Sequence, residues 1–198
     1  LQTSVMLHGT VRLPAVFSDH MVLQREMRLP VWGWADPGEK VTVSFCGQKV
    51  SVVTPSSGKW MLYLEPVKAG GPYEMKIEGS NQLTIQDILV GEVWICSGQS
   101  NMAMELGECQ DAAREVNAAQ YPEIRQFQVK RFKALEPLED VTPVTDPASA
   151  WLNTWEVCSP STAGHFTGAG YFFARDLHQE FHMPVGILHA SWGGTTAE

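Results

Sequence analysis

The sequence predicts an α/β protein with two parts: an all-β domain over residues 1–88 and a parallel-sheet α/β domain over residues 89–198. Two observations support this prediction. Residues 11–88 contain short runs in which apolar and polar residues alternate, which is typical of half-buried strands. From residue 89 onward, nearly continuous apolar runs alternate with helix-like segments. This alternation favours a parallel sheet with right-handed crossovers.

The first part is predicted to contain four strands, at residues 41–45, 49–53, 59–65 and 73–78. Turn-forming sequences such as "ADPGE", "PSSG" and "AGGP" separate the runs. In the third run, Trp60, Leu62 and Leu64 fall on one face with a period of two. Short strands at this spacing indicate a small β-sandwich or jelly-roll-like domain. We interpret Trp32, Trp34 and Trp60 as core residues, with a sugar-binding surface as the alternative.

The second part is predicted to contain three buried strands, at residues 88–96, 124–129 and 185–190, and two helices, at residues 101–119 and 165–182. The second helix places one set of side chains on a single apolar stripe: Phe166, Gly170, Phe173, Leu177 and Phe181. Residues 130–154 are rich in proline and acidic residues and predict a long loop, which in compact domains is often functional. Residues 155–160 predict a short extended segment.

The composition argues against several classes of protein. A formal net charge of −8 disfavours nucleic acid and anionic membranes as main partners. No window of about 20 apolar residues occurs, so we expect no membrane span. The start "LQTSVMLHGTVRLP" lacks the basic and apolar regions of a signal peptide. We therefore expect a processed N-terminus of a secreted or periplasmic protein.

The cysteines predict neither a zinc site nor a redox motif. Cys46, Cys96, Cys109 and Cys158 form no C-x-x-C pair. We expect isolated buried thiols, and one disulfide in an exported protein is the alternative.

Two loops of small residues are predicted at one edge of the parallel sheet. The sequence "SGQSN" (97–101) follows the strand at 88–96, and "SWGGTTAE" (191–198) follows the strand at 185–190. Ligands of open α/β sheets bind at the carboxyl ends of the strands. We therefore expect an active site where these two loops meet.

Ser100 is the candidate nucleophile at this edge. A serine hydroxyl needs a base that takes its proton and donors that stabilise the oxyanion. Gln99 and Asn101 carry side-chain amides, and Gly193 and Gly194 present backbone N–H groups without a Cβ. The spacing departs from the G-x-S-x-G elbow of α/β-hydrolases, because Met102 takes the place of the second glycine. A serine that caps the following helix is the alternative.

The block "VWICSGQSNMAMEL" resembles the Gly-Gln-Ser-Asn-Met block of the sialate O-acetylesterase family, which are SGNH-type carbohydrate esterases. Further blocks resemble this family in the same order, at residues 13–26, 31–43, 58–79 and 184–198. The resemblance implies a flavodoxin-like α/β/α hydrolase domain preceded by an accessory β-domain. It also implies that Ser100 is the nucleophile and that sugar O-acetyl esters are hydrolysed without a metal or another cofactor.

One part of the family pattern is missing from the chain. SGNH enzymes take their catalytic histidine from a late D-x-x-H block, and no Asp in this sequence has a His three positions later. The chain also stops inside a predicted active-site loop, with about three parallel strands and an uncovered sheet edge. We expect residues 89–198 to be the N-terminal part of an incomplete hydrolase domain. A missing C-terminal segment or a second chain is then expected to carry the catalytic His and Asp.

The histidines can each have a structural role instead of a catalytic or metal-binding one. His189 lies near the expected site and is the alternative base, against a role as a core residue. His165 fits a capping or surface role. His178 and His182 are four residues apart, but they lack the H-E-x-x-H pattern, so we expect a solvated helix end rather than a metal site. Three acidic residues of the long loop are expected to be solvated rather than a glycosidase pair: Glu136, Glu139 and Asp140.

The leading hypothesis is a serine carbohydrate O-acetylesterase. The resemblance favours 9-O-acetyl groups of sialic acid as substrate, with acetylated xylan or other plant glycans as alternatives. A second hypothesis is a non-catalytic carbohydrate-binding protein on the same scaffold. A third, a lipase or thioesterase, would need an apolar acyl groove beside the two loops.

Overall fold

The structure is a computed structural model that describes residues 11–194. Its first part contains the strands β1 (Val22–Gln24), β2 (Leu29–Trp34), β3 (Lys40–Phe45), β4 (Gln48–Val53), β5 (Lys59–Leu64), β6 (Gly70–Glu78) and β7 (Gln82–Gly98). Its second part contains the helices α1 (Ser100–Ala103), α2 (Ala112–Ala118) and α3 (Gly168–Phe181) and the strands β8 (Tyr121–Gln128), β9 (Trp155–Cys158) and β10 (Val185–Ser191). Short 3₁₀ helices occur at Leu106–Glu108, Pro147–Ser149 and Ala163–His165.

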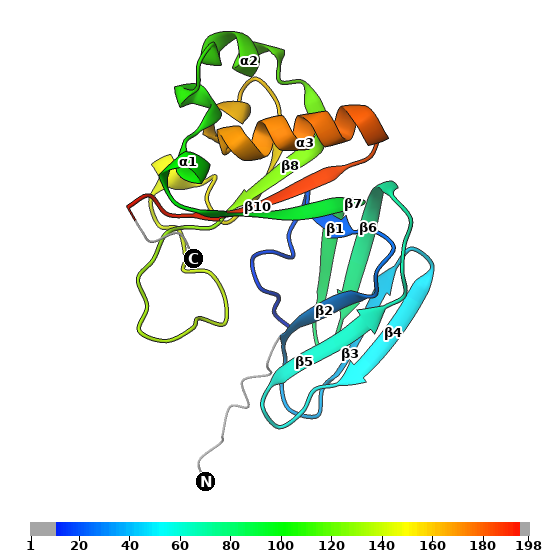
Figure 1. Ribbon diagram of the computed structural model, residues 1–198. Coiled ribbons are helices and arrows are strands. Elements are labelled where there is room, and N and C mark those ends of the chain that lie inside the picture. Colours follow the sequence, from blue (N-terminus) through cyan, green and yellow to red (C-terminus); the bar gives the residue numbers. More distant parts are fainter. Residues whose placement is uncertain (1–10, 195–198) are drawn as a thin grey trace.

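The strands of the described region form two sheets. The larger has eight strands in the order β4-β3-β6-β7-β10-β8-β9, with β1 also paired to β7, and the smaller joins β2 and β5. The helices lie over the part of the large sheet made by β7, β10 and β8 (Figure 1). No helix of residues 11–194 is long and apolar enough to cross a membrane.

The first part is all-β, as predicted, because its strands alternate between core and solvent. In β5, Trp60, Leu62 and Leu64 are buried while their neighbours are exposed. They share one core with residues of β3 such as Val41 and Val43. The four predicted strands are confirmed as β3 to β6, whereas β1 and β2 were not predicted. The predicted jelly-roll connectivity stays a prediction.

The strand β7 has 17 residues and belongs to both parts of the molecule. Its first half pairs antiparallel with β6 and, over residues 89–91, parallel with β1. Its second half, residues 92–98, pairs parallel with β10. The predicted domain boundary after residue 88 therefore lies inside one continuous strand. Gly91 is required where the halves meet, because a Cβ there would lie 2.0 Å from the carbonyl oxygen of Pro184.

The second part contains the predicted parallel strands β7, β10 and β8, and β9 adds antiparallel to β8. Tyr171 and Ala174 of α3 pack against Val185 and Ile187 of β10. In the described residues the helices cover one face of this sheet (Figure 1). A second helical layer, which the α/β/α arrangement requires, stays a prediction.

The predicted helix over residues 101–119 is wrong, because the segment breaks into α1, a 3₁₀ turn and α2. Some of its peptide groups bond across the fold. The N–H of Leu106 donates to Phe166, and the carbonyl of Met104 accepts from Gly168. Asp111 then adopts a φ of 58°, which ends any continuous helix. Tertiary hydrogen bonds thus overrode helix propensity in this stretch.

The predicted second helix is confirmed as α3, and the predicted stripe is confirmed in part, because Phe166 and Gly170 are buried and Leu177 packs against the same core. Gly170, Tyr171 and Ala174 are buried against the sheet. Phe173 and Phe181 of the predicted stripe are 42% and 58% exposed. Phe173 meets Trp94 of β7 edge-on, at 5.0 Å between ring centroids.

The structure also gives the pairing and burial of the cysteines and the packing of the tryptophans. All four cysteines are unpaired, so the disulfide alternative is wrong, although Cys46 is exposed and only Cys96 and Cys158 are buried. Trp60 is a core residue, and Trp32 packs edge-on against Phe17 at 4.6 Å between ring centroids.

Candidate active site

The two predicted loops lie side by side at the carboxyl edge of the parallel sheet. β7 and β10 are neighbours in register, with Ser191 opposite Gly98. The N–H of Trp192 donates to the carbonyl of Gly98 at 2.9 Å, which ties the two loops together. Ser100 follows β7 directly and begins α1. This adjacency follows from the general behaviour of parallel strands, whose carboxyl ends share one edge.

A hollow of about 570 Å³ opens where the loops meet. Its lining residues are Ser100, Asn101, Ala103, Met104, Glu105, Glu108, Arg131, Trp192 and Gly193. Three of the five predicted site residues line it, namely Ser100, Asn101 and Gly193. Gln99 does not line it and instead accepts the N–H groups of Met102 and Ala103 with its carbonyl. Gly194 also lies outside the lining and adopts a φ of 79°.

Ser100 and Gly193 lie close together. A Cβ built on Gly193 would lie 3.6 Å from Ser100 Oγ, so the glycine leaves the hydroxyl open. Within residues 11–194, no hydrogen bond joins Ser100 Oγ to another group, and Gln99 holds the N-cap position of α1. The capping alternative for Ser100 is therefore wrong. Gly98 adopts a φ of 126°, a conformation that favours glycine, and this turn carries the chain from β7 into α1.

Thr167 holds α1 in place from the far side. Its buried Oγ1 donates to the carbonyl of Met102 at 2.6 Å, and its N–H donates to Oε1 of Gln126 at 2.9 Å. The N–H of Gly168 donates to the carbonyl of Met104 at 2.8 Å. α1 has only four residues, so these bonds, and not helix length, fix the position of Ser100.

The two glutamates of the hollow are already engaged. Glu105 and Glu108 form a reciprocal capping box, in which each carboxylate accepts the backbone N–H of the other residue. Glu105 also lies 3.7 Å from Nδ1 of His165. Burial raises the pKa of the Glu105 carboxyl, and the nearby charge of Glu108 raises it further. These side chains thus stabilise the wall of the hollow.

Arg131 is the cation of the hollow. Its Nε donates to the carbonyl of Ser191 at 3.2 Å, which places the guanidinium beside the loop that contains Gly193. In the described part of the chain, its terminal amino groups make no hydrogen bond. They remain available to an anionic group of a ligand.

His189 is not placed to act as the base for Ser100. It is buried, and its Nε2 lies 2.5 Å from Oγ of Ser191 in a hydrogen bond. Burial lowers the pKa of His189 to about 4, and the charge of Arg131 contributes. A neutral imidazole with this pKa is a weak general base. His189 fits the core role that was weighed against the catalytic one.

Three further histidines of the described residues have other contacts. His165 stacks on Trp151 at 4.7 Å between ring centroids, as a partly exposed residue beside the hollow. His178 Nδ1 bonds the carbonyl of Met183 at 2.9 Å, and His182 caps the end of α3 with a φ of 50°. No group of three metal-ligating side chains occurs in residues 11–194.

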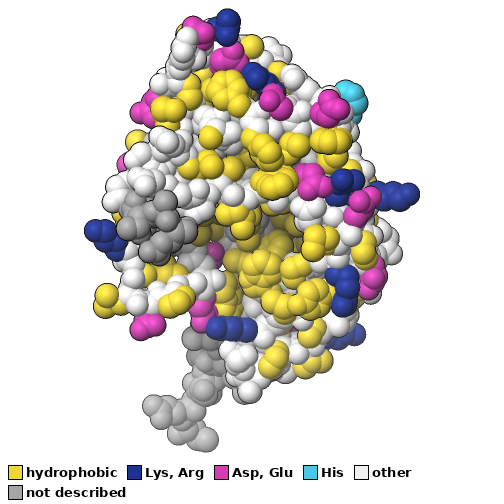
Figure 2. Space-filling view, in the orientation of Figure 1, with side chains coloured by type: hydrophobic (Ala, Val, Ile, Leu, Met, Phe, Trp, Pro, Cys, Tyr) yellow, Lys and Arg dark blue, Asp and Glu magenta, His cyan; other side chains and the backbone are white. Residues whose placement is uncertain are grey.

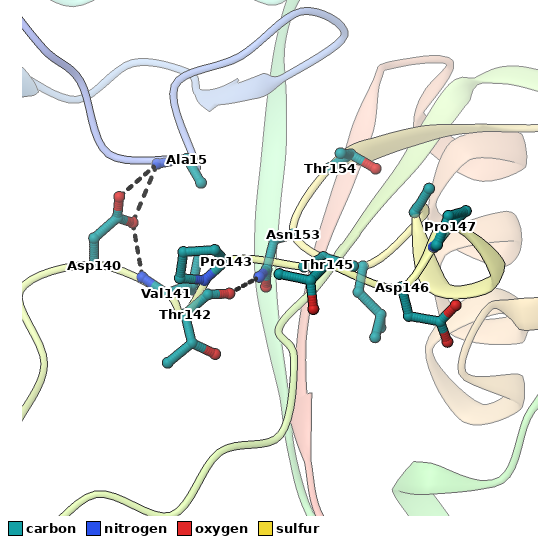
Figure 3. A pocket seen from close by; sticks show the side chains of 13 residues that line it. Ala15, Asp140, Val141, Thr142, Pro143, Thr145, Asp146, Pro147, Asn153 and Thr154 are labelled. Carbon is teal, nitrogen blue, oxygen red and sulfur yellow. Dashed lines mark hydrogen bonds between the residues drawn. The ribbon is translucent and has the colours of Figure 1, made fainter.

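The long loop over residues 130–154 is anchored by its own polar groups. The carboxylate of Asp140 accepts the N–H of Ala15 at 3.1 Å, and Asn153 Nδ2 donates to the carbonyl of Thr142 at 2.8 Å, around a pocket of about 540 Å³ (Figure 3). Glu139 pairs with Lys59 at 2.5 Å. Glu136, Glu139 and Asp140 are exposed, as expected, and Glu139 and Asp140 also anchor the loop.

Sequence reasoning missed Arg131, Glu105 and Glu108. Arg131 could have been found, because it follows β8, whose carboxyl end reaches the same edge as β7 and β10. Nothing in the sequence pattern indicated Glu105 and Glu108 as site residues. The predicted continuous helix over residues 101–119 did not place them beside the hollow.

Comparisons with known proteins agree with this geometry. No protein-family model matches the chain. It is 34% identical to mouse and to human sialate O-acetylesterase over 94% of its length. A crystal structure of a carbohydrate acetylesterase from Xanthomonas citri superposes over 94% of the chain, with a TM-score of 0.87 and 36% identity.

The match covers only part of each relative. The chain spans 37% and 38% of the length of the mouse and human proteins and 41% of the bacterial structure. The predicted resemblance is confirmed: over 94% of its length, the chain is similar to proteins named sialate O-acetylesterase.

Proposed function

We propose that this chain supplies the nucleophile of a serine esterase that removes O-acetyl groups from carbohydrates. One observation carries the proposal. Ser100 is exposed and unbonded within the described residues, beside Gly193 at the carboxyl edge of a parallel sheet. The chain that presents it is related to proteins named as sialate O-acetylesterases and as a carbohydrate acetylesterase.

The proposed reaction has two steps. Ser100 Oγ attacks the acetyl carbonyl carbon while a base takes its proton, and the sugar oxygen leaves with that proton. Water then hydrolyses the acetyl-serine and releases acetate. The N–H of Gly193 and the side-chain amide of Asn101 are the proposed donors to the oxyanion. Gln99 and Gly194 flank these groups, and their contact with substrate stays a prediction.

The base is proposed to come from outside this sequence. No histidine of the described residues forms a hydrogen bond with Ser100 Oγ, and His189 is bonded to Ser191. A His–Asp pair on a further segment or a second chain fits the short coverage of the relatives. Secretion or a periplasmic location also stays a prediction.

The finer proposal is that the substrate is a 9-O-acetylated sialic acid. Sialic acid carries a carboxylate, and Arg131 presents unbonded amino groups in the hollow that contains Ser100. Arginine pairs well with carboxylates because two parallel N–H groups meet two oxygens. The acetylated xylose backbone of a xylan is neutral and has no carboxylate for this cation. This observation favours sialate over the plant-glycan alternative.

Ser100→Ala tests the nucleophile. We expect hydrolysis of 4-nitrophenyl acetate and of 9-O-acetyl-N-acetylneuraminate by the protein from its natural source to fall at least about 100-fold, because losing a triad nucleophile removes the covalent step. Thermal stability should not change, since Ser100 is exposed. Ser97→Ala, at another exposed serine of the same segment, is the matched control. Residual activity above about a hundredth, or an equal loss in the control, contradicts the assignment. Sugar binding by a wild-type protein without hydrolysis favours the carbohydrate-binding alternative.

Arg131→Gln tests the sialate proposal. A charge-assisted hydrogen bond contributes about 1.5–3 kcal/mol, so we expect kcat/KM for 9-O-acetyl-N-acetylneuraminate to fall about 10- to 100-fold. Hydrolysis of a neutral acetylated xylose should stay within about twofold. Lys133→Gln is the control, because Lys133 is an exposed cation near Arg131 that does not line the hollow. Equal loss with both substrates means that Arg131 only shapes the loop.

A further inference from the structure

We infer that His189 and Ser191 form a positioning pair, which holds the backbone N–H of Gly193 in the direction that the proposed oxyanion contact requires. The inference rests on the proposed function, in which Gly193 donates to the oxyanion, and it deepens that proposal by naming residues that act through this glycine. Neither side chain of the pair touches the substrate in this arrangement. The evidence is a buried layer of polar side chains beside the candidate site.

Most of the buried polar side chains of the described region belong to one layer. Charged side chains are spread over the face of the molecule drawn in Figure 2, as expected for groups that bind water. Within residues 11–194, seven polar or charged residues are buried. Five of these seven form the polar layer: Gln126, Gln128, Thr167, His189 and Ser191. A buried polar group costs stability unless it is hydrogen-bonded, so this concentration in one place is a departure from an ordinary core.

The polar layer extends from β8 to β10 and reaches α1. Gln126 Nε2 and Gln128 Oε1 are 3.4 Å apart on β8, and Gln128 is opposite His189 in the register of β8 and β10. Gln126 Oε1 accepts the N–H of Thr167, whose hydroxyl donates to the carbonyl of Met102 in α1. Hydrogen bonds between buried polar groups hold the elements around them in one arrangement. One end of the layer thus fixes α1.

The other end of the polar layer acts on the loop that contains Gly193. His189 Nε2 and Ser191 Oγ lie 2.5 Å apart in a hydrogen bond, and both side chains are buried. A hydroxyl can both donate and accept, so the bond forms with either neutral tautomer of the imidazole. Ser191 is the last residue of β10, and Gly193 follows two positions later. The bond therefore fixes the residue at which the chain leaves the sheet for the loop.

The peptide unit between Ser191 and Trp192 is held at both of its polar groups. Its carbonyl accepts from Nε of Arg131 at 3.2 Å, and its N–H donates to the carbonyl of Gly98 at 2.9 Å. The side chain of Ser191 adds a third attachment, to the polar layer. Peptide units are planar and share their Cα atoms, so a shift of this unit turns the next one, which carries the Gly193 N–H. An oxyanion donor acts at about 2.7–3.1 Å from the developing charge, so a small turn of that unit alters catalysis.

The imidazole of His189 also departs from ordinary core chemistry. Within the described residues, its Nδ1 is buried and has no hydrogen-bond partner, which lowers stability. An apolar side chain of similar size would avoid this cost but would lose the bond to Ser191. Local departures of this kind are expected at functional sites. Because His189 is not placed to act as the base for Ser100, the role that the geometry supports is to hold Ser191.

Substitutions at the pair test the inference in the protein from its natural source. His189→Leu and Ser191→Ala each remove the hydrogen bond, and we expect each to lower kcat for 4-nitrophenyl acetate about 10-fold, with KM within about twofold. The reason is that a displaced oxyanion donor weakens an interaction made only in the transition state. His189→Gln keeps an amide within reach of Ser191 and should keep kcat within about threefold of the wild type. If His189→Leu does not fold, Ser191→Ala decides, because it removes only one hydroxyl.

The double variant and a control separate a positioning role from a general loss of stability. Because both substitutions remove the same bond, His189→Leu combined with Ser191→Ala should lower kcat no more than about twofold beyond the larger single effect. Thr54→Val is the control, since Thr54 is a buried residue of the first part whose Oγ1 has no hydrogen-bond partner within the described residues. A kcat within about threefold of the wild type in both single variants overturns the inference. Multiplicative losses in the double variant, or an equal loss in Thr54→Val, also overturn it.

Hydrogen exchange at the Trp192 amide gives a readout that does not depend on the reaction. This N–H donates to the carbonyl of Gly98, so loosening Ser191 should expose it. We expect exchange at least about 10-fold faster in Ser191→Ala than in the wild type, with the amide of Ile187 in the middle of β10 unchanged. Unchanged exchange at Trp192 overturns the pair, even where activity falls. Failure of the proposed function is recognised separately, by hydrolysis that survives Ser100→Ala, and exchange at Trp192 then still tests the pair.

Discussion

The two halves of β7 share one strand and one kind of sequence, yet their surroundings differ. In the first half, Ile85, Ile88 and Val90 are buried, and β6 and β1 pair with the strand. In the second half, Trp94 and Ile95 are exposed, and only β10 pairs with the strand among the described residues. The first half is part of a closed core. Within residues 11–194, the second half has a strand partner on one edge only.

This difference shows that residue type predicts a strand better than it predicts burial. The run "ILVGEVWIC" was predicted as a strand covered on both faces. The prediction is correct for Ile88 and Val90 and wrong for Ile95 in this chain. Apolar side chains are buried only where another element supplies the opposing surface.

The largest expected effect on stability tests the difference between the two halves of β7. It uses one alanine substitution in each half. In the 198-residue chain, Ile88→Ala should lower the free energy of unfolding by about 2–5 kcal/mol, because it leaves a cavity in a closed core. Ile95→Ala should change it by less than about 0.5 kcal/mol, because the side chain is exposed. Urea unfolding measures both values. Similar losses at the two positions mean that the halves do not differ.

A smaller effect concerns the free energy of unfolding at low pH. It is expected from His189 of β10, the strand that pairs with the second half of β7. His189 lies opposite Cys96 of β7, and its folded pKa of about 4 is below the value of about 6.5 expected for the unfolded chain. The unfolded chain therefore binds the proton first. This contribution is complete at neutral pH and is lost as the pH falls from about 6.5 to 4.

His189→Gln should remove on the order of 2 kcal/mol from the difference in unfolding free energy between pH 7 and pH 4. His178→Gln, at the end of α3, is the control. Urea unfolding at both pH values checks the prediction, and an unchanged pH dependence in His189→Gln contradicts it.

Local patterns predicted much of the fold. The alternation of Trp60, Leu62 and Leu64 predicted β5 and its buried face, and the helix-like run before Pro184 predicted α3. Period and turn chemistry act within a few residues, so they can be read along the chain. β1 was missed because it is three residues long and exists through its pairing with β7.

The candidate site was predicted in part for a similar reason. Strand order was not needed to expect Ser100 and Gly193 at one edge, since both follow parallel strands. Arg131 and the engaged pair Glu105 and Glu108 could not be assigned, because their positions depend on how residues 103–108 break from helix. Hydrogen bonds that Thr167 and Gly168 donate, and one that the carbonyl of Phe166 accepts, impose that break.

The sequence by itself determined the all-β first part, the parallel strands that follow, the position of Ser100 after one of these strands, and the resemblance to the sialate O-acetylesterases. Only the tertiary structure decided that one strand joins both parts, that Gly91 permits the junction, and that Ile95 is exposed in the described residues. The physical reason is the distance along the chain over which each effect acts. Side-chain period and turn preference are local, whereas burial, close backbone approach and strand pairing depend on residues far apart in the chain.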